Sequence, residues 1–122
     1  MIQERSILKV ADNSGAKTIR CFRILGGSRK KIARLGDVII ASVQVAEPRK
    51  NVKKKDIVKA VIVRARTNMR RRGGLYVRFD DNAAVLINAK KEPVGTRIFG
   101  PIPRELKEKG YEKIVSLAED IV

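Results

Sequence analysis

The chain has 122 residues, with 28 Lys or Arg against 13 Asp or Glu, so its formal net charge at pH 7 is +15. This length favours a single domain over residues 1–122, and a hydrophobic fraction of 43% is sufficient for a core. A body this positive repels itself unless an anionic partner is bound, so nucleic acid is the first candidate and an anionic membrane the second. No segment is apolar over the ~20 residues that span a bilayer, and one cysteine indicates a reducing compartment.

The first part of the chain predicts three strands separated by turn residues. They are expected over 6–11, 17–25 and 38–46. The second has apolar residues on both faces, which predicts either burial on both sides or a bulge that shifts its register. In the third, alternation puts four residues on one face: Ile39, Ala41, Val43 and Val45. The loop between the second and third strands is basic and carries Arg29, Lys30, Lys31 and Arg34.

A second basic segment, the connector over 49–56, leads into an apolar run at 57–63 that predicts a core strand. Its cations are Arg49, Lys50, Lys53, Lys54 and Lys55. Another core strand is expected at 83–87. Between the two, Gly73-Gly74 lies between β-rich runs and predicts a hairpin over about 64–79. The arginines of this hairpin are Arg64, Arg66, Arg70, Arg71, Arg72 and Arg78.

The pattern changes in the last quarter of the chain, beyond the loop at 90–95. Pro103 and Gly110 bracket a short helix. A second short helix is expected because four apolar residues recur at helical spacing: Ile114, Leu117, Ala118 and Ile121. Short strands followed by two helical turns predict a mainly β fold. It is expected as a small closed β-barrel with strands within about 6–87, a projecting β-hairpin, and a short C-terminal helical part of loop and helices over about 95–122.

No catalytic or metal-binding constellation is evident in the sequence. Histidine is absent, which removes the commonest general base and metal ligand. Cys21 is expected in a strand as core filler, and Asp80-Asp81 as a turn, because adjacent strand residues point to opposite faces. No phosphate-binding glycine motif follows a strand. We therefore expect no enzyme activity, no cofactor and no metal.

The basic segments are the features that suggest a function. Three runs of cations recur around Lys30, Lys54 and Arg71, each on a predicted loop or hairpin tip, so they could converge on one partner. Arginine suits bidentate phosphate contact. Aromatics make up only 4% of the chain and form no stacking platform, which favours structured RNA held by shape and phosphates. The expected helices are too short and too balanced in charge for membrane binding, so no membrane partner is expected.

Several stretches of the chain match the pattern of one known family. They are Val10–Ala16, Gly36–Val38, Ala60–Val63, Gly95–Pro101, Arg104–Leu106 and Ile114–Ala118, with Gly74, Phe79, Asn82, Val85 and Leu86 between them. By these stretches the chain resembles the family of the universal large-subunit ribosomal protein fourteen. Three positions depart from the family pattern, and Pro103 is one of them, being unusual for its place. Gly73 stands where aspartate is usual, and Glu119 stands where proline is usual, which would let the last helix continue.

The resemblance implies a five-stranded barrel with a projecting β-ribbon, in a bacterial or organellar form. It implies binding to large-subunit rRNA, contact with the neighbouring ribosomal protein nineteen, and contact with small-subunit rRNA across an intersubunit bridge. It also implies a docking site for a ribosome silencing factor at Thr96, Arg97 and Lys113. The expected location is the ribosome, in the cytoplasm or in an organellar matrix or stroma. The alternative is a free-standing RNA-binding barrel or RNA chaperone.

Overall fold

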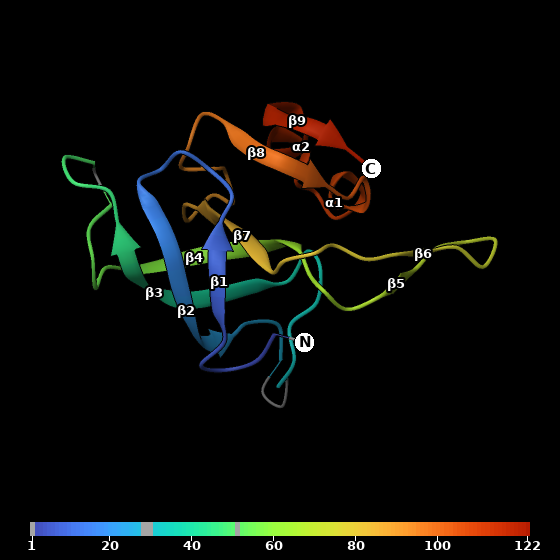
Figure 1. Ribbon diagram of the computed structural model, residues 1–122, viewed down its shortest axis with the longest axis horizontal. Coiled ribbons are helices and arrows are strands. Elements are labelled where there is room, and N and C mark those ends of the chain that lie inside the picture. Colours follow the sequence, from blue (N-terminus) through green and yellow to red (C-terminus); the bar gives the residue numbers. More distant parts are fainter. Residues whose placement is uncertain (1, 28–30, 51) are drawn as a thin grey trace.

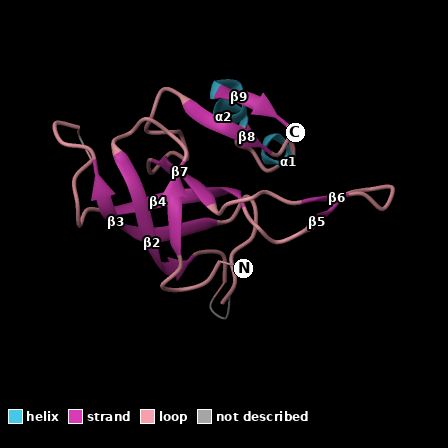
Figure 2. Cartoon of the chain, in the orientation of Figure 1, coloured by secondary structure: helices cyan, strands magenta, loops and turns pink. Residues whose placement is uncertain are grey.

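The computed structural model describes residues 2–27, 31–50 and 52–122 (Figure 1). The strands in these residues are β1 (Ile7–Val10), β2 (Ala16–Ile24), β3 (Val38–Ala46), β4 (Ile57–Arg64), β5 (Met69–Arg70), β6 (Tyr76–Val77), β7 (Ala83–Ile87), β8 (Ile98–Ile102) and β9 (Ala118–Ile121). The helices are α1 (Glu105–Glu108) and α2 (Glu112–Leu117). Strands and loops dominate, and both helices lie near the C-terminal end (Figure 2).

Five strands form a closed barrel in the order β1-β2-β3-β4-β7. Neighbouring strands pair antiparallel, except that β7 closes the barrel by pairing parallel with β1, with Lys9 opposite Ala83 and Val10 opposite Ala84. The predicted closed barrel and its five strands are confirmed. β3 has the predicted bounds, and β1, β2 and β4 differ from the prediction by one or two residues at their ends.

A β-bulge explains the two apolar faces of β2. Cys21 pairs with Ala41 and Arg23 with Ile40, so the register shifts between them. The extra residue, Phe22, is 45% exposed, while Cys21 is fully buried. The sequence left two alternatives for this strand, burial on both sides or a bulge, and the bulge is the correct one. The prediction that Val45 shares a face with Ile39, Ala41 and Val43 is wrong. Those three are buried and Val45 is 49% exposed, because the pairing of β2 with β3 shifts twice near Thr18, at the end of the barrel.

β4 and β7 are buried on both faces, and each face belongs to a different core. Their inward side chains, including Ile62 and Leu86, pack inside the barrel with the residues of β1, β2 and β3. Their outward side chains, including Val61 and Val85, form a second cluster with the C-terminal part, where Ile114 is fully buried. This double burial is the reason why the sequence has continuous apolar runs here instead of alternation.

The C-terminal part corrects the prediction. The expected second helix stops at Leu117, and Ala118 is already extended, with φ −75° and ψ 142°. The chain continues as β9, which pairs parallel with β8 through Ile98 opposite Ala118 and Ile102 opposite Ile121. Pairing with β8 supplies backbone partners that a longer helix would have had to find internally. Glu119 thus lies in a strand, and the expectation that it prolongs the helix is wrong.

Asp12 joins three segments that are distant in sequence. It is only 6% exposed, and its carboxylate accepts hydrogen bonds from Ser14 N at 3.1 Å, Ser14 Oγ at 2.6 Å and Leu86 N at 3.1 Å. Asp12 also forms an isolated bridge with Ile98. Burial raises the pKa of this carboxyl, and the hydrogen bonds from Ser14 and Leu86 act in the opposite direction. The turn after β1 therefore fixes β7 and the start of β8 as well as connecting strands.

Replacing Asp12 should destabilise the whole fold. Asp12→Ala leaves the buried Leu86 N–H without its acceptor, so we expect the free energy of unfolding to fall by ~1–3 kcal/mol in urea titration. Asp12→Asn keeps one acceptor oxygen for Ser14 and should lose less. An unfolding midpoint unchanged by Asp12→Ala would contradict the role given to this carboxylate.

Candidate nucleic-acid interface

The hairpin and the connector lie at opposite ends of the barrel. The connector precedes β4 and the hairpin follows it, so the length of an eight-residue strand, about 26 Å at ~3.3 Å per residue, separates them. Figure 1 shows the connector loop at one extreme of the long axis and β5–β6 projecting at the other. The three basic runs therefore do not gather at one place, as the sequence suggested they could.

The loop before β3 lies at the hairpin end, because Val38 at the start of β3 pairs with Val61 near the end of β4. Its Lys31 and Arg34 are exposed. Arg29 and Lys30 lie outside the described residues. Asp37 Oδ2 accepts a hydrogen bond from Arg34 N at 2.7 Å and holds the turn that presents this loop.

The connector, at the other end of the barrel, also combines a turn held by an aspartate with exposed cations. Its side chains Arg49, Lys50, Lys53, Lys54 and Lys55 are all exposed. Asp56 Oδ2 accepts a hydrogen bond from Lys53 N at 2.9 Å, and Lys55 N donates to Val43 O at 2.8 Å. These hydrogen bonds fix the backbone at 53–56, while the cationic side chains are exposed to solvent.

The hairpin projects on very short strands. β5 and β6 have two residues each, fewer than the run at 75–79 predicted. Gly73 and Gly74 form the tip with φ +86° and +80°, a left-handed backbone at two successive residues that only glycine adopts readily. Phe79 turns back into the barrel core at 7% exposure.

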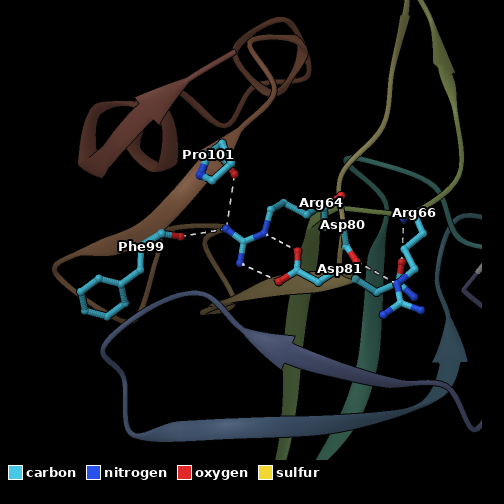
Figure 3. A network of polar contacts seen from close by, with 7 residues as sticks. Arg64, Arg66, Asp80, Asp81, Phe99 and Pro101 are labelled. Atoms are coloured by element: carbon cyan, nitrogen blue, oxygen red, sulfur yellow. Dashed lines mark hydrogen bonds and ion pairs between the residues drawn. The ribbon is translucent and has the colours of Figure 1, made fainter.

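The Arg64 guanidinium points toward Asp81 and toward the carbonyl oxygens of Phe99 and Pro101 (Figure 3). It is 9% exposed, and its Nε donates to Asp81 Oδ1 at 2.9 Å. Its Nη1 donates to the carbonyl oxygens of Phe99 at 2.8 Å and Pro101 at 3.3 Å. A guanidinium committed to one carboxylate and two carbonyls connects β4 to β8, so Arg64 would have to give up these bonds to contact RNA.

Two other hairpin arginines are also engaged with the protein. Arg66 Nε donates to Asp80 O at 2.9 Å. Arg71 Nε lies 2.6 Å from Glu105 Oε1, and its Nη2 donates to Glu105 Oε2 at 3.0 Å and to Val122 O at 2.6 Å. Arg71 thus ties the hairpin to the C-terminal part, and its exposure is intermediate.

The remaining hairpin arginines are the ones available to a partner. Arg70, Arg72 and Arg78 are exposed. Among the described residues, no hydrogen bond or ion pair engages their guanidinium groups. An uncommitted guanidinium can contact a phosphate without breaking an existing bond, so this trio is the strongest candidate for RNA contact on the hairpin.

The sequence analysis missed a set of basic residues on the barrel wall. These exposed side chains are Lys9 on β1, Lys17, Arg20 and Arg23 on β2, and Lys59 on β4. They stand singly among apolar residues, so they form no run. Strand alternation was the signal that could have found them, since an exposed cation on a strand must lie on the outer face of the barrel.

The three predicted docking residues lie near the C-terminal part. Thr96 N and Arg97 N donate to Asn13 Oδ1 at 2.9 and 3.1 Å, so the turn after β1 shapes this loop. Thr96 and Lys113 line one shallow hollow of about 280 Å³. Arg97 is exposed, pairs with Glu119 Oε1 at 2.8 Å and lies over the Phe99 ring at 5.6 Å from its centroid. Lys113 Nζ pairs with Glu92 Oε1 at 3.0 Å.

No catalytic or metal-binding cluster is evident in the described residues. In residues 2–27, 31–50 and 52–122, no three His, Cys, Asp or Glu side chains gather as a metal site. Cys21 is fully buried, and burial raises the pKa of its thiol, which disfavours the reactive thiolate. No helix of the described chain has the length and apolarity needed to cross a bilayer.

The fold and its surface define a small basic β-barrel protein with a projecting cationic hairpin. The family model described as ribosomal protein L14p/L23e matches residues 1–122, and the chain belongs to this family. It is therefore a structural constituent of the large ribosomal subunit, located on ribosomes of the cytoplasm or of an organelle. Binding of rRNA is typical of the family, and its members are structural and not enzymatic. The resemblance found in the sequence is confirmed.

The inward role of Arg64 can be tested against an outward arginine of the same hairpin region. Arg64→Ala leaves Asp81 and two carbonyl oxygens without their donor, and we expect the free energy of unfolding to fall by ~2–4 kcal/mol. Arg72→Ala, which changes the charge equally at an exposed site, should shift it by less than ~0.5 kcal/mol. Equal unfolding midpoints for the two variants in urea titration would refute the assignment.

Proposed function

We propose that the chain binds large-subunit rRNA with cations at both ends of the barrel. At the hairpin end the contacts come from Lys31, Arg34, Arg70, Arg72 and Arg78, and at the other end from the connector. The observation that carries this proposal is the division of the hairpin arginines. Arg64, Arg66 and Arg71 hold the protein together, while the others are exposed without a partner in the described chain.

The separation of the two ends supports a particular mode of binding. Because β4 lies between them, the connector and the hairpin would contact different parts of the rRNA, and the protein would bridge two segments of a folded RNA. The basic residues of the barrel wall, such as Arg20 and Arg23, extend the cationic surface between the ends. Arg29 and Lys30 belong to the proposed surface by sequence alone.

The resemblance supports further partners. We infer contact with the neighbouring ribosomal protein nineteen and, across an intersubunit bridge, with small-subunit rRNA. Sedimentation distinguishes this proposal from the alternative function, a free-standing RNA chaperone. A protein that stays with large subunits through a high-salt wash is a constituent, whereas a chaperone would remain at the top of the gradient.

The loop at 95–97 and the start of α2 form the proposed docking surface for a ribosome silencing factor. Arg97 carries most of this proposal, because it is exposed and lies beside an exposed aromatic ring. Arginine and aromatic residues are enriched among the residues that dominate interface energies. The ion pairs of Arg97 and Lys113 with the chain's own carboxylates would have to open or be shared when a partner binds.

The rRNA proposal predicts a steep dependence on salt. If about six phosphates are neutralised, the logarithm of the association constant for an rRNA fragment should fall with the logarithm of salt concentration at a slope of roughly −4 to −5. Arg70→Ala/Arg72→Ala should reduce the magnitude of that slope by about 2, whereas Lys90→Ala/Lys107→Ala, a charge-matched pair outside the basic runs, should leave it unchanged. A slope near zero for the unsubstituted protein would rule out phosphate-dominated binding.

The docking proposal is tested on assembled subunits. Arg97→Ala should leave folding and incorporation into large subunits intact but weaken silencing-factor binding by ~2 kcal/mol, about thirtyfold, in a pull-down titration with purified subunits. Arg104→Ala, at another exposed arginine of the C-terminal part, serves as the control. Undiminished factor binding by Arg97→Ala and Lys113→Ala subunits would exclude this surface.

A further inference from the structure

A groove of about 510 Å³ lies at the hairpin end of the barrel, between the loop before β3 and the base of the β5–β6 hairpin. Its volume is within the ~300–1,000 Å³ typical of pockets that hold small ligands. The barrel walls, the connector and the docking surface contribute no residue to it. The groove is therefore a feature distinct from the exposed hairpin tip.

The floor of the groove is apolar and packs against the barrel core. Leu35 is 8% exposed and belongs to the barrel core, and Met69 packs against the same core. Ile32 is 38% exposed, so part of its side chain is accessible in the groove. A flat apolar group placed here would cover Ile32 and contact the thioether side chain of Met69.

The walls of the groove are cationic. Arg34, Arg70 and Lys109 line it, and no acidic side chain does. Arg34 and Arg70 are exposed, and their guanidinium groups have no partner among the described residues. Lys109 is held in place, because its Nζ donates to Leu35 O at 2.7 Å. Its side chain also crosses Gly36, where a Cβ atom would clash with it.

We propose that this groove takes one unpaired nucleotide of an RNA, with its phosphate between Arg34 and Arg70 and its base over Ile32 and Met69. An apolar floor between unpaired cations complements an anionic phosphate joined to a flat base. Arginine planes and apolar side chains are surfaces on which splayed-out RNA bases stack. The cations continue beyond the groove through Lys31 and Arg72, as binding a polymer of phosphates requires. The inference rests on the proposed rRNA binding and adds to it a preference for an unpaired base.

The test compares two RNA helices that differ by one nucleotide. One carries a single bulged 2-aminopurine, and the other is the same helix fully paired. The full-length protein should bind the bulged helix about tenfold more tightly, a difference of ~1.4 kcal/mol, and should change the fluorescence of the 2-aminopurine. Arg34→Ala/Arg70→Ala and Ile32→Ser should each reduce the preference to within about twofold and suppress the fluorescence change.

Matched controls distinguish an effect of the groove from a general effect of lost charge or lost apolar surface. Arg72→Ala/Arg78→Ala removes the same number of positive charges from outside the groove and should weaken binding of both helices to the same extent. Ile57→Ser removes an aliphatic side chain that is 70% exposed on the barrel wall. Both should keep the tenfold preference. Circular dichroism and thermal unfolding would verify that every variant is folded.

Three results would overturn the inference, and they differ in what they mean for the proposed function. Equal, salt-dependent binding of both helices by the unsubstituted protein would contradict nucleotide binding in the groove but would agree with the proposed rRNA binding. Failure to bind either helix, or any large-subunit rRNA fragment, would remove both. A preference that survives Arg34→Ala/Arg70→Ala and Ile32→Ser would place the recognition of the bulge elsewhere.

Discussion

The arrangement of the molecule depends on the hydrogen bonds that the Arg64 guanidinium donates. This group joins the end of β4 to Asp81, just before β7, and to the carbonyl oxygens of Phe99 and Pro101 in β8. The backbone at Gly100 approaches so closely that a Cβ there would clash with the Arg64 side chain. This buried side chain thus helps to fix the C-terminal part against the barrel, together with Asp12 at the start of β8 and the second hydrophobic cluster.

This arrangement separates the residues that build the protein from those that can bind. Arg64, Arg66 and Arg71 donate to oxygens of the chain itself, whereas the guanidinium groups of the other hairpin arginines have no partner in the described chain. The distinction matters because a net charge of +15 says only that an anion is expected. The structure adds which cations can reach that anion, and it divides them between two ends that β4 holds apart.

Much of the barrel could be predicted from the sequence because its signals are local. β3 alternates cleanly, and Gly73-Gly74 requires a turn. The apolar runs of β4 and β7 predicted core strands, but not that a second cluster covers their outer faces. β8 and β9 were missed because Gly100-Pro101 resembles a break and Ile121 repeats at helical spacing, while pairing between distant segments decides the outcome. The inward position of Arg64 also depends on distant partners, so composition could not distinguish it from Arg70.

A crosslink map of the protein on large-subunit rRNA tests the central claim most directly. A photoreactive group placed in turn beside Arg72 at the hairpin end and beside Lys54 in the connector would report which RNA lies at each end. Crosslinks from both positions, to two rRNA segments distant in the RNA sequence, are the expected result. An absence of crosslinks from both ends, with strong crosslinks from a position beside Glu119, would contradict an interface built from the uncommitted cations.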